Sequence, residues 1–198
     1  YTVIQVKNKE TRKQIAALAG PQPWVELSPL FLVFCADLKR AQTACHYENK
    51  EMVSGYTEQF IISTVDVALA AQNAMIAAES MGLGGVYIGG IRNDPETVCK
   101  LLKIPDHVYP VFGMCLGYPD ENQEQKPSLP VSMILNDEYY QEDNTDLEKY
   151  NEICKDYYQT RTNSSREDTW TRQISIMMSN PARPHMKAFL KKRGFEFK

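Results

Sequence analysis

The chain has 198 residues, enough for one domain to bury a sizeable core without disulfides or metal ions. Its 43% hydrophobic and 24% charged residues are ordinary for a soluble globular protein. The net charge of −3 gives no reason to expect nucleic acid or an anionic membrane as a partner. The function must therefore be sought in local motifs.

The first part of the chain predicts a strand, a helix and a second strand. Residues 1–6 are rich in β-branched and aromatic side chains, which is typical of a strand. Asn8 can cap a helix over residues 9–19. An irregular connection at residues 22–24 follows, and then residues 30–36 form a continuous apolar run of strand length. That run predicts a central strand of a sheet.

Residues 38–51 are mixed and polar, which predicts a short helix and a loop. Residues 57–81 form the longest predicted helix, in which the polar residues Gln59, Asp66, Asn73 and Ser80 recur every seven positions. We expect this helix to be buried on most sides, in part against the same helix of a partner subunit. It is interrupted by Asp66, Gln72 and Asn73, so we do not expect a transmembrane span.

The remainder predicts two more strands and several helices. Residues 86–90 read as a buried strand, Asp94 as the cap of a helix ending near Lys103, and residues 108–118 as another strand. Helical patterns then occupy residues 147–159, 170–179 and 185–193. Strands mixed with long helices indicate a single α+β domain, with a core over residues 1–136 and a helical C-terminal extension over residues 137–198.

The five cysteines are odd in number, far apart and free of CxxC spacing; they are Cys35, Cys45, Cys99, Cys115 and Cys154. With only three histidines, this pattern disfavours a zinc site. Cys35 and Cys115 lie in apolar runs, where a small buried hydrophobe is the usual explanation. A reducing cytoplasm fits this cysteine usage best.

The most informative segment is GLGGVYIGGIR, residues 82–92, where five glycines bracket a short strand. Glycine lets a backbone approach a flat ligand closely, so that N–H groups can recognise it. A dinucleotide-binding GxGxxG motif would need a glycine at Tyr87 and would follow a strand, so this segment is not one. The alternative is a strand whose glycines only permit tight packing.

The predicted helix 57–81, the GLGGVYIGG segment and Lys126-Pro127 together resemble the oxygen-insensitive NADPH nitroreductase and flavin reductase family. The resemblance implies a three-layer α/β/α domain with a mixed, largely antiparallel sheet. It also implies a homodimer with FMN at the subunit interface and the C-terminal extension wrapped around the partner. In that family the backbone matching Tyr87, Ile88, Gly89 and Gly90 runs along the flavin ring and reaches its N5/O4 edge.

Two further segments would contribute to flavin binding by the same resemblance. Gln22 lies in a Gly-Pro-Gln connection similar to the family's Gly-Gly-Gln, whose glutamine faces the flavin; the alternative is a surface glutamine. Lys126 matches the lysine of a Lys-Pro-Arg motif near the flavin phosphate or pyrimidine edge. Ser128 replaces the arginine and can offer only a neutral hydrogen bond, which predicts weaker flavin affinity.

Two arginines, Arg161 and Arg166, stand among small polar residues and could cradle a phosphate; the alternative is a mobile charged loop. Their surroundings resemble the family pattern Thr-Arg…Arg…Asp-Thr-Trp, whose first arginine recognises the 2′-phosphate of NADPH. An acid at Glu167, where relatives carry a second adjacent arginine, would weaken discrimination against NADH. Arg183 is a weaker candidate for the same site.

The family's His-Arg-Ser-x-Arg motif, which contacts the ribityl phosphate, would lie before Tyr1. We therefore expect the sequence to be a fragment of a longer protein or a processed product, and FMN to bind more weakly without that motif. No Ser–His–Asp set, Walker A loop or metal-ligand cluster emerges, so cofactor chemistry is favoured over side-chain catalysis.

The sequence thus predicts an FMN-dependent NAD(P)H oxidoreductase with a ping-pong mechanism. The electron acceptor would be a small molecule: a nitroaromatic, a quinone or free flavin. One alternative is a non-catalytic dimeric protein that binds flavin or nucleotide and retains the fold. A remoter one is an unrelated α+β structural module, which would bind no flavin.

Overall fold

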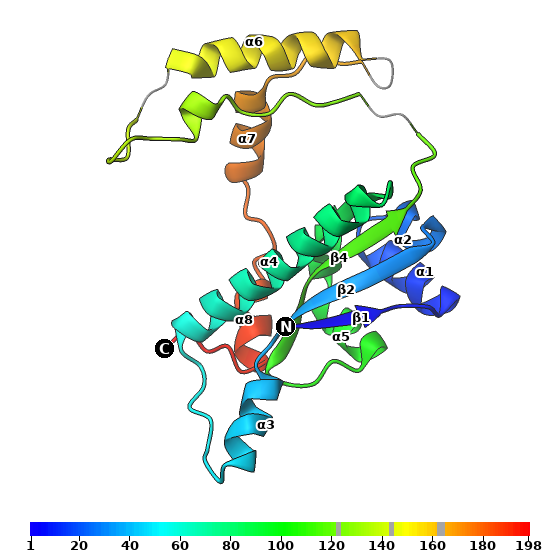
Figure 1. Cartoon of the computed structure of the whole chain (residues 1–198), viewed down its shortest axis with the longest axis vertical. Helices are drawn as coiled ribbons and strands as arrows, with labels where there is room; N and C mark the ends of the chain where they lie inside the picture. Colours follow the sequence, from blue (N-terminus) through cyan, green and yellow to red (C-terminus); the bar gives the residue numbers. More distant parts are fainter. Residues whose placement is uncertain (122–123, 143–144, 162–164) are drawn as a thin grey trace. The chain divides into compact units, whose positions relative to one another are not determined.

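A computed structural model describes residues 1–121, 124–142, 145–161 and 165–198 (Figure 1). The chain divides into two compact units. The first comprises Tyr1–Asp120 and Arg183–Lys198, and the second comprises Glu121–Ala182. Each unit has a cluster of buried hydrophobic side chains of its own.

The centre of the first unit is a four-stranded sheet in the order β1-β2-β4-β3. Its strands are β1 (Thr2–Gln5), β2 (Leu30–Asp37), β3 (Gly84–Ile88) and β4 (Val108–Gly117). All three pairings are antiparallel, which is the extreme form of the largely antiparallel sheet that the sequence predicts. The apolar run of β2 is central, as predicted, since it pairs with β1 on one side and with β4 on the other.

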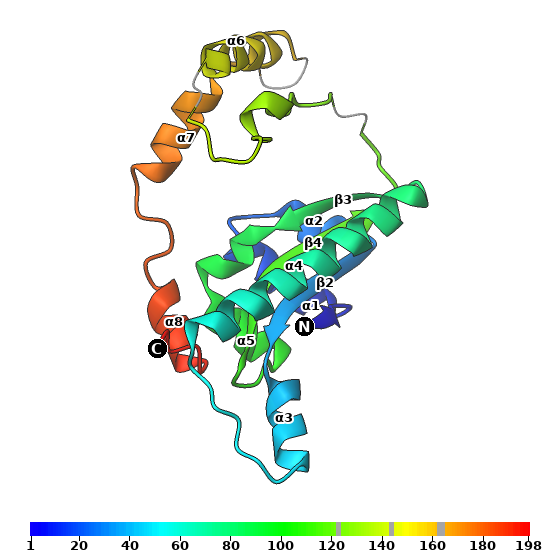
Figure 2. The same cartoon turned by 60° about the vertical axis from the view of Figure 1, so that its left-hand side comes forward.

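Helices cover both faces of this sheet and complete three layers. The long helix α4 (Thr57–Ser80) runs across one face, and α1 (Lys9–Leu18) and α5 (Pro95–Leu102) lie on the other (Figures 1 and 2). The α3 helix (Lys39–Tyr47) follows β2, and α8 (Met186–Lys192) is the last helix of the unit. The predicted α+β, three-layer architecture is confirmed.

The capping predictions are also confirmed. Oδ1 of Asn8 accepts a hydrogen bond from the backbone N–H of Thr11 at 2.9 Å and so starts α1. Asp94 starts α5 in the same way, because its carboxylate accepts from the backbone N–H of Thr97 at 3.0 Å. The helix ends at Lys103, which adopts the left-handed conformation with φ 52°.

Two local predictions are wrong. The connection predicted at residues 22–24 begins a short helix, α2 (Pro23–Leu27), because proline at the first helical position is pre-organised for helix geometry. The predicted strand 86–90 begins earlier, at Gly84, and ends at Ile88; Gly89–Asn93 form a 3-10 helix, η1. This strand is also not buried, because β3 lies at the sheet edge and leaves Val86 and Tyr87 partly exposed.

The long helix α4 buries one stripe rather than most of its surface. Its buried residues are Ser63, Val67, Ala71, Met75 and Ala78, at helical spacing. Large apolar side chains elsewhere on the helix are exposed, namely Ile61, Ile62, Val65, Leu69 and Ile76. The predicted burial on most sides is therefore wrong for this chain by itself. Contrary to the sequence expectation, α4 is long and apolar enough to cross a membrane by length and composition alone. One such helix is weak evidence for a membrane-spanning protein, because core helices of soluble proteins pass the same test.

The second unit is built on α6 (Thr145–Thr160) and α7 (Trp170–Met178), with a 3-10 helix, η2 (Val131–Met133). Tyr150, Cys154 and Tyr158 recur at four-residue spacing on one face of α6 and are buried. The side chains that pack on them are Leu129, Met133, Tyr157 and Trp170. The helices predicted in this part of the chain are present, with α6 beginning two residues earlier and ending one residue later than expected.

All five cysteines are free thiols. Cys35 and Cys115 are buried among hydrophobic side chains, which confirms their interpretation as small core residues. Burial raises the pKa of Cys35 to about 12, with smaller contributions from Cys99 and Asp37, so this thiol stays protonated and unreactive at neutral pH.

Candidate functional site

The glycine segment forms an open sheet edge. On one side β3 pairs with β4, with Gly84 opposite Gly117 and Ile88 opposite Gly113. Within the described ranges, no strand pairs with its other side. Backbone groups along that edge are therefore available to a ligand, because a strand leaves half of its N–H and C=O groups unpaired when it lacks a second neighbour.

Two of the glycines are required by packing inside the chain. A Cβ atom on Gly85 would stand 2.6 Å from both Cδ2 of Leu116 and Sδ of Met75. A Cβ on Gly90 would overlap the carbonyl group of Ala19 at the end of α1. The packing explanation therefore holds for these two positions, since any side chain there would displace neighbouring atoms.

Gly89 differs from these two glycines. The nearest atoms that a Cβ would meet all belong to the guanidinium of Arg92, at 3.4 Å or more, which is ordinary van der Waals contact. The Tyr87 ring is held by packing, because its hydroxyl donates to Oε1 of Gln72 at 3.2 Å and its centroid lies 5.2 Å from that of Phe112. What a flat ligand can contact at residues 87–89 is therefore the backbone.

The structure brings Gln22 to the neighbourhood of the glycine segment. Its backbone N–H donates to the carbonyl of Ala16 at 3.1 Å, which holds the connection against the end of α1. Nδ2 of Asn93, in η1, donates to the carbonyl of Leu18 at 3.3 Å, so η1 lies against the same helix end. The Gln22 side chain makes no capping bond and is half-buried.

Arginines that the sequence reading did not place in the flavin site lie close to Gly89. The Arg92 guanidinium donates to the carbonyl of Val111, and Nε of Arg183 donates to Oδ1 of Asn93 at 2.9 Å. Burial first, and then the charge of Arg183, lowers the pKa of Arg92. The signal was available in the sequence, since Arg92 stands two residues after the Gly89-Gly90 pair.

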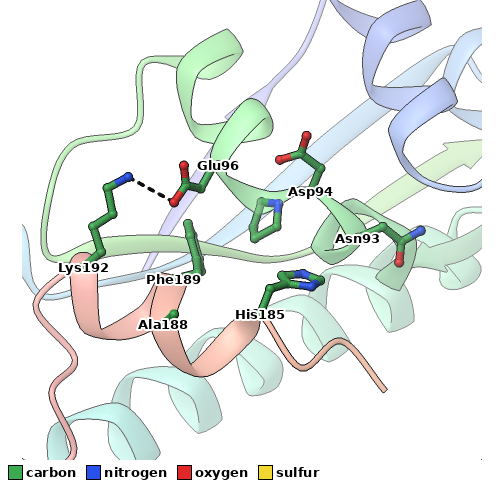
Figure 3. Close-up of a pocket in the computed structure, with 8 residues that line it drawn as sticks. Asn93, Asp94, Glu96, His185, Ala188, Phe189 and Lys192 are labelled. Atoms are coloured by element: carbon green, nitrogen blue, oxygen red, sulfur yellow. Dashed lines mark hydrogen bonds and ion pairs between the residues drawn. The ribbon is translucent and has the colours of Figure 1, made fainter. Parts of the chain in front are cut away.

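Residues of α8 and the position just before it bind to the segment that follows β3. Nε2 of His185 donates to the carbonyl of Arg92 at 2.9 Å, and Lys192 pairs with Glu96 at 3.1 Å across a cavity of about 360 Å³ between α5 and α8 (Figure 3). Asp94, which also lines the cavity, is engaged in capping α5. These polar groups at the cavity therefore already have partners, and the pair Lys192–Glu96 links α8 to α5.

No group of three or more His, Cys, Asp or Glu side chains among the described residues could hold a metal ion.

In the second unit, predicted site residues gather on one ring. The charged ends of three side chains lie near the ring centroid of Tyr158: Nζ of Lys126 at 5.8 Å, Cζ of Arg161 at 5.1 Å and Cζ of Arg166 at 4.6 Å. Each is within the range of a cation–π interaction. Tyr158 was missed by sequence reasoning, although its spacing from Tyr150 and Cys154 marks it as part of the buried face of α6.

Acidic side chains next to this cluster have specific partners. Arg166 pairs with Asp168 at 3.0 Å, and Glu167 pairs with Lys155 at 3.2 Å. The sequence expectation was that Glu167 would oppose phosphate binding; its pairing with Lys155 reduces that effect. Residues 162–164 of the predicted loop lie outside the described ranges.

The Lys126-Pro127-Ser128 segment is anchored to α6. The Tyr150 hydroxyl donates to the carbonyl of Pro127 at 3.0 Å, and burial, followed by interactions with Cys154, raises the pKa of Tyr150 to about 12. Lys126 is thereby held beside the Tyr158 ring, while the side chain of Ser128 is exposed. The bond from Tyr150 to Pro127 involves only neutral groups, so it does not pair with the Lys126 ammonium, which can contact a ligand.

An α+β domain with an open glycine-rich edge, together with a cluster of cations suited to phosphate, defines a protein of the kind that binds a flat cofactor and a phosphorylated nucleotide. The model of the Nitroreductase family matches residues 2–118, and that of the Nitroreductase family, C-terminal domain, matches residues 126–198. The chain belongs to the nitroreductase family.

Individual relatives agree with this assignment. The chain is 42% identical to the "FMN reductase (NADPH)" of Bacillus subtilis (strain 168), over 98% of this chain and 81% of the relative. It is 40% identical to the "Oxygen-insensitive NADPH nitroreductase" of Salmonella typhimurium, over 98% of this chain and 80% of the relative. The solved structure of NfrA1 from B. megaterium superposes with a TM-score of 0.94 at 48% identity, covering 98% of this chain and 81% of that one.

Proposed function

We propose that this protein is an FMN-dependent NAD(P)H oxidoreductase that reduces nitroaromatics, quinones or free flavin. The observation that carries the proposal is the similarity of nearly the whole chain to a relative named as an NADPH-dependent FMN reductase and to one named as an NADPH nitroreductase. The open, glycine-rich edge of β3 supports it, because it offers a backbone surface to a flat ring system.

The residues of the first unit fit a flavin. Tyr87, Ile88, Gly89 and Gly90 present backbone to the ring, and packing fixes this backbone because Gly90 is pressed against the end of α1. N–H groups held in place in this way stabilise negative charge that develops on a bound ring at no cost in reorganisation. Gln22 supplies an amide that can donate and accept at the pyrimidine edge.

The residues of the second unit fit charged groups. Lys126 binds an anionic part of FMN, Ser128 adds a neutral hydrogen bond, and Arg161 and Arg166 bind the phosphate of NADPH. When bound, FMN supplies the redox chemistry, taking a hydride from the reduced nucleotide and delivering electrons to the acceptor. The side chains position both molecules and take no covalent part in the reaction.

A second copy of the chain covers the exposed apolar side of α4. Five large apolar side chains of α4 are exposed, and a patch of this kind marks an interaction site; they are Ile61, Ile62, Val65, Leu69 and Ile76. We place the subunit contact of a homodimer there, with residues 137–198 wrapping the partner, and the enzyme in the cytoplasm. Its electron acceptor is a small molecule.

The first experiment is a visible absorption spectrum after incubation with FMN and desalting, followed by NADPH under argon. A retained flavin spectrum that bleaches, and recovers when a nitroaromatic or quinone is added, supports the proposal. A retained spectrum that NADPH does not bleach supports the alternative of a non-catalytic flavin-binding protein. A chain that retains no flavin, even at FMN concentrations that saturate its relatives, contradicts both.

A further inference from the structure

Tyr158 stands at the centre of the cation cluster, and we infer that it is the positioning residue of the nucleotide-phosphate site. Its ring holds Arg161 and Arg166 so that they face the 2′-phosphate of NADPH together, and it also contacts Lys126, the lysine that we assign to FMN. This inference rests on the proposed function and adds to it the residue that determines the preference for NADPH over NADH.

The three cations come from different segments and repel one another. Lys126 precedes η2, Arg161 follows α6, and Arg166 precedes α7. Two unit charges about 4 Å apart repel by roughly 1 to 4 kcal/mol in water or near a protein surface. A shared support is therefore required, and the negative face of an aromatic ring provides one for each cation in contact with it.

The ring can serve as this support because it is fixed. Tyr158 is 3% exposed on the buried face of α6. Its neighbour Tyr157 packs against it with ring centroids 5.2 Å apart, and its hydroxyl lies 3.2 Å from Oε1 of Gln173 in α7. An immobile ring limits the positions available to the cations and lowers the entropic cost of ordering them on a ligand.

The pKa of the Tyr158 hydroxyl reflects the same positively charged surroundings. Burial acts to raise the pKa of Tyr158, but hydrogen bonds with Gln173, Lys126 and Arg166 and the charge of Lys126 outweigh it, so the pKa lies below its usual value. The amide of Gln173 can turn its NH₂ group toward the oxygen when the phenol ionises. The lysine and Arg166 thus contact the oxygen as well as the ring.

A phosphate dianion matches the cluster in charge and shape. Arginine presents a planar fork of donors that pairs with two phosphate oxygens, and lysine adds a point charge. Asp168 pairs with Arg166 at 3.0 Å and orients its fork. NADH has no phosphate at the 2′ position, so removal of the support affects NADPH far more than NADH.

The test compares three variants of the FMN-loaded protein by steady-state kinetics with NADPH and NADH and one acceptor. Tyr158→Leu removes the ring and should raise KM for NADPH about tenfold, consistent with the loss of several cation–π contacts, while KM for NADH changes less than about twofold and kcat is kept. Tyr158→Phe retains the ring and should stay within about threefold of the parent protein. Tyr140→Leu, the loss of an exposed ring in the same unit, should leave the NADPH-to-NADH ratio unchanged.

A Tyr158→Leu variant that raises both KM values equally, or that leaves both unchanged, would overturn the inference, as would a Tyr158→Phe variant as impaired as the leucine variant. Binding of 2′,5′-ADP, measured by calorimetry, tests it without turnover and without the leucine variant. This probe should raise the pH at which one phenol of the parent protein ionises, because it neutralises the cations, and should have no such effect in Tyr158→Phe. A parent protein that binds 2′,5′-ADP in this way but oxidises no nucleotide would refute the proposed activity and uphold the role of Tyr158.

Discussion

The two candidate binding regions, one in each unit, recognise ligands by opposite means. The glycine segment of the first unit offers backbone and close packing, with Gly85 and Gly90 pressed against neighbouring atoms. The cation cluster of the second unit offers side-chain charge, gathered on the single ring of Tyr158. A backbone site tolerates almost no added atom, whereas a side-chain site can lose one charge and still bind.

This difference predicts different consequences of mutation. Changes in the glycine segment should disturb folding and flavin binding together, because the same backbone serves both. Changes in the cation cluster should alter the affinity for one ligand while the fold persists, because exposed or half-exposed charges contribute little to stability. Five experiments examine this contrast.

The largest effect is expected from Gly90→Ala. The added methyl group would overlap the carbonyl of Ala19, so η1 and the end of α1 must separate, and we expect a loss of at least about 3 kcal/mol in the free energy of unfolding together with loss of FMN. Gly89→Ala is the matched control, because the nearest atom to its methyl group is in the Arg92 guanidinium at 3.4 Å, an ordinary contact. Urea unfolding and flavin retention measure both. Equal stability of the two variants would contradict the distinction drawn between these glycines.

The next effect concerns the arginines. Arg161→Ala and Arg166→Ala should each raise KM for NADPH roughly tenfold, since a hydrogen bond to a charged group contributes about 1.5 to 3 kcal/mol, and should leave thermal stability nearly unchanged. Lys149→Ala is the control, because Lys149 pairs with Asp146 at 3.4 Å on α6 and is not one of the three cations on the Tyr158 ring. If Lys149→Ala weakens NADPH binding as much as the arginine variants, a general surface charge rather than a defined cluster is responsible.

A smaller effect should follow from Tyr150→Phe. The substitution removes the hydroxyl that donates to the carbonyl of Pro127 at 3.0 Å and leaves the ring in place. We expect a stability loss of about 1 kcal/mol and a rise of roughly fivefold in the FMN dissociation constant, because Lys126 is less well held. Tyr157→Phe removes a hydroxyl nearby without touching this anchor. An unchanged FMN affinity in Tyr150→Phe would show that the segment is positioned by other contacts.

Much of the fold could be predicted from the sequence because its signals are local. Asn8 and Asp94 accept bonds from N–H groups three residues away, so their role depends on no distant part of the chain. The apolar run of β2 predicts a central strand for the same reason. The exposure of α4 and the edge position of β3 could not be predicted in this way, because they depend on which surfaces a neighbouring element or subunit covers.

The candidate site was predictable only in part. Family resemblance marked Lys126, Arg161 and Arg166 individually, but their convergence on Tyr158 depends on the path of three separate segments around α6. Tyr158 itself has the apolar spacing of a core residue, so a sequence pattern assigns it to packing. The packing role of Gly85 and Gly90 likewise appears only when Met75 and Ala19 are brought beside them.

The finest distinction between the regions is in the ionisation of their tyrosines. In the first unit, burial raises the pKa of Tyr109 from an ordinary value of 10.0 to about 12, while its bond with Thr64 and the charge of Arg92 act in the opposite direction. In the second unit the pKa of Tyr158 is lowered by the cations around it. A phenolate titration of the folded protein should therefore show Tyr158 among the first phenols to ionise and Tyr109 among the last, with Tyr158→Phe and Tyr109→Phe identifying them.

The two tyrosines should also affect alkaline stability with opposite signs. A raised folded-state pKa contributes stability that is fully present below about pH 10 and is lost as the pH rises through about 12; for Tyr109 the loss is about 1 kcal/mol at pH 11. A lowered folded-state pKa contributes stability that is present above the unfolded value and is lost as the pH falls, which applies to Tyr158. Tyr109→Phe should therefore flatten the decline in unfolding free energy above pH 10, whereas Tyr158→Phe should remove a gain in stability that accrues as the pH rises toward 10. If Tyr158→Phe removes no such gain, the cations do not stabilise the Tyr158 phenolate, and the ring contacts alone must account for the cluster.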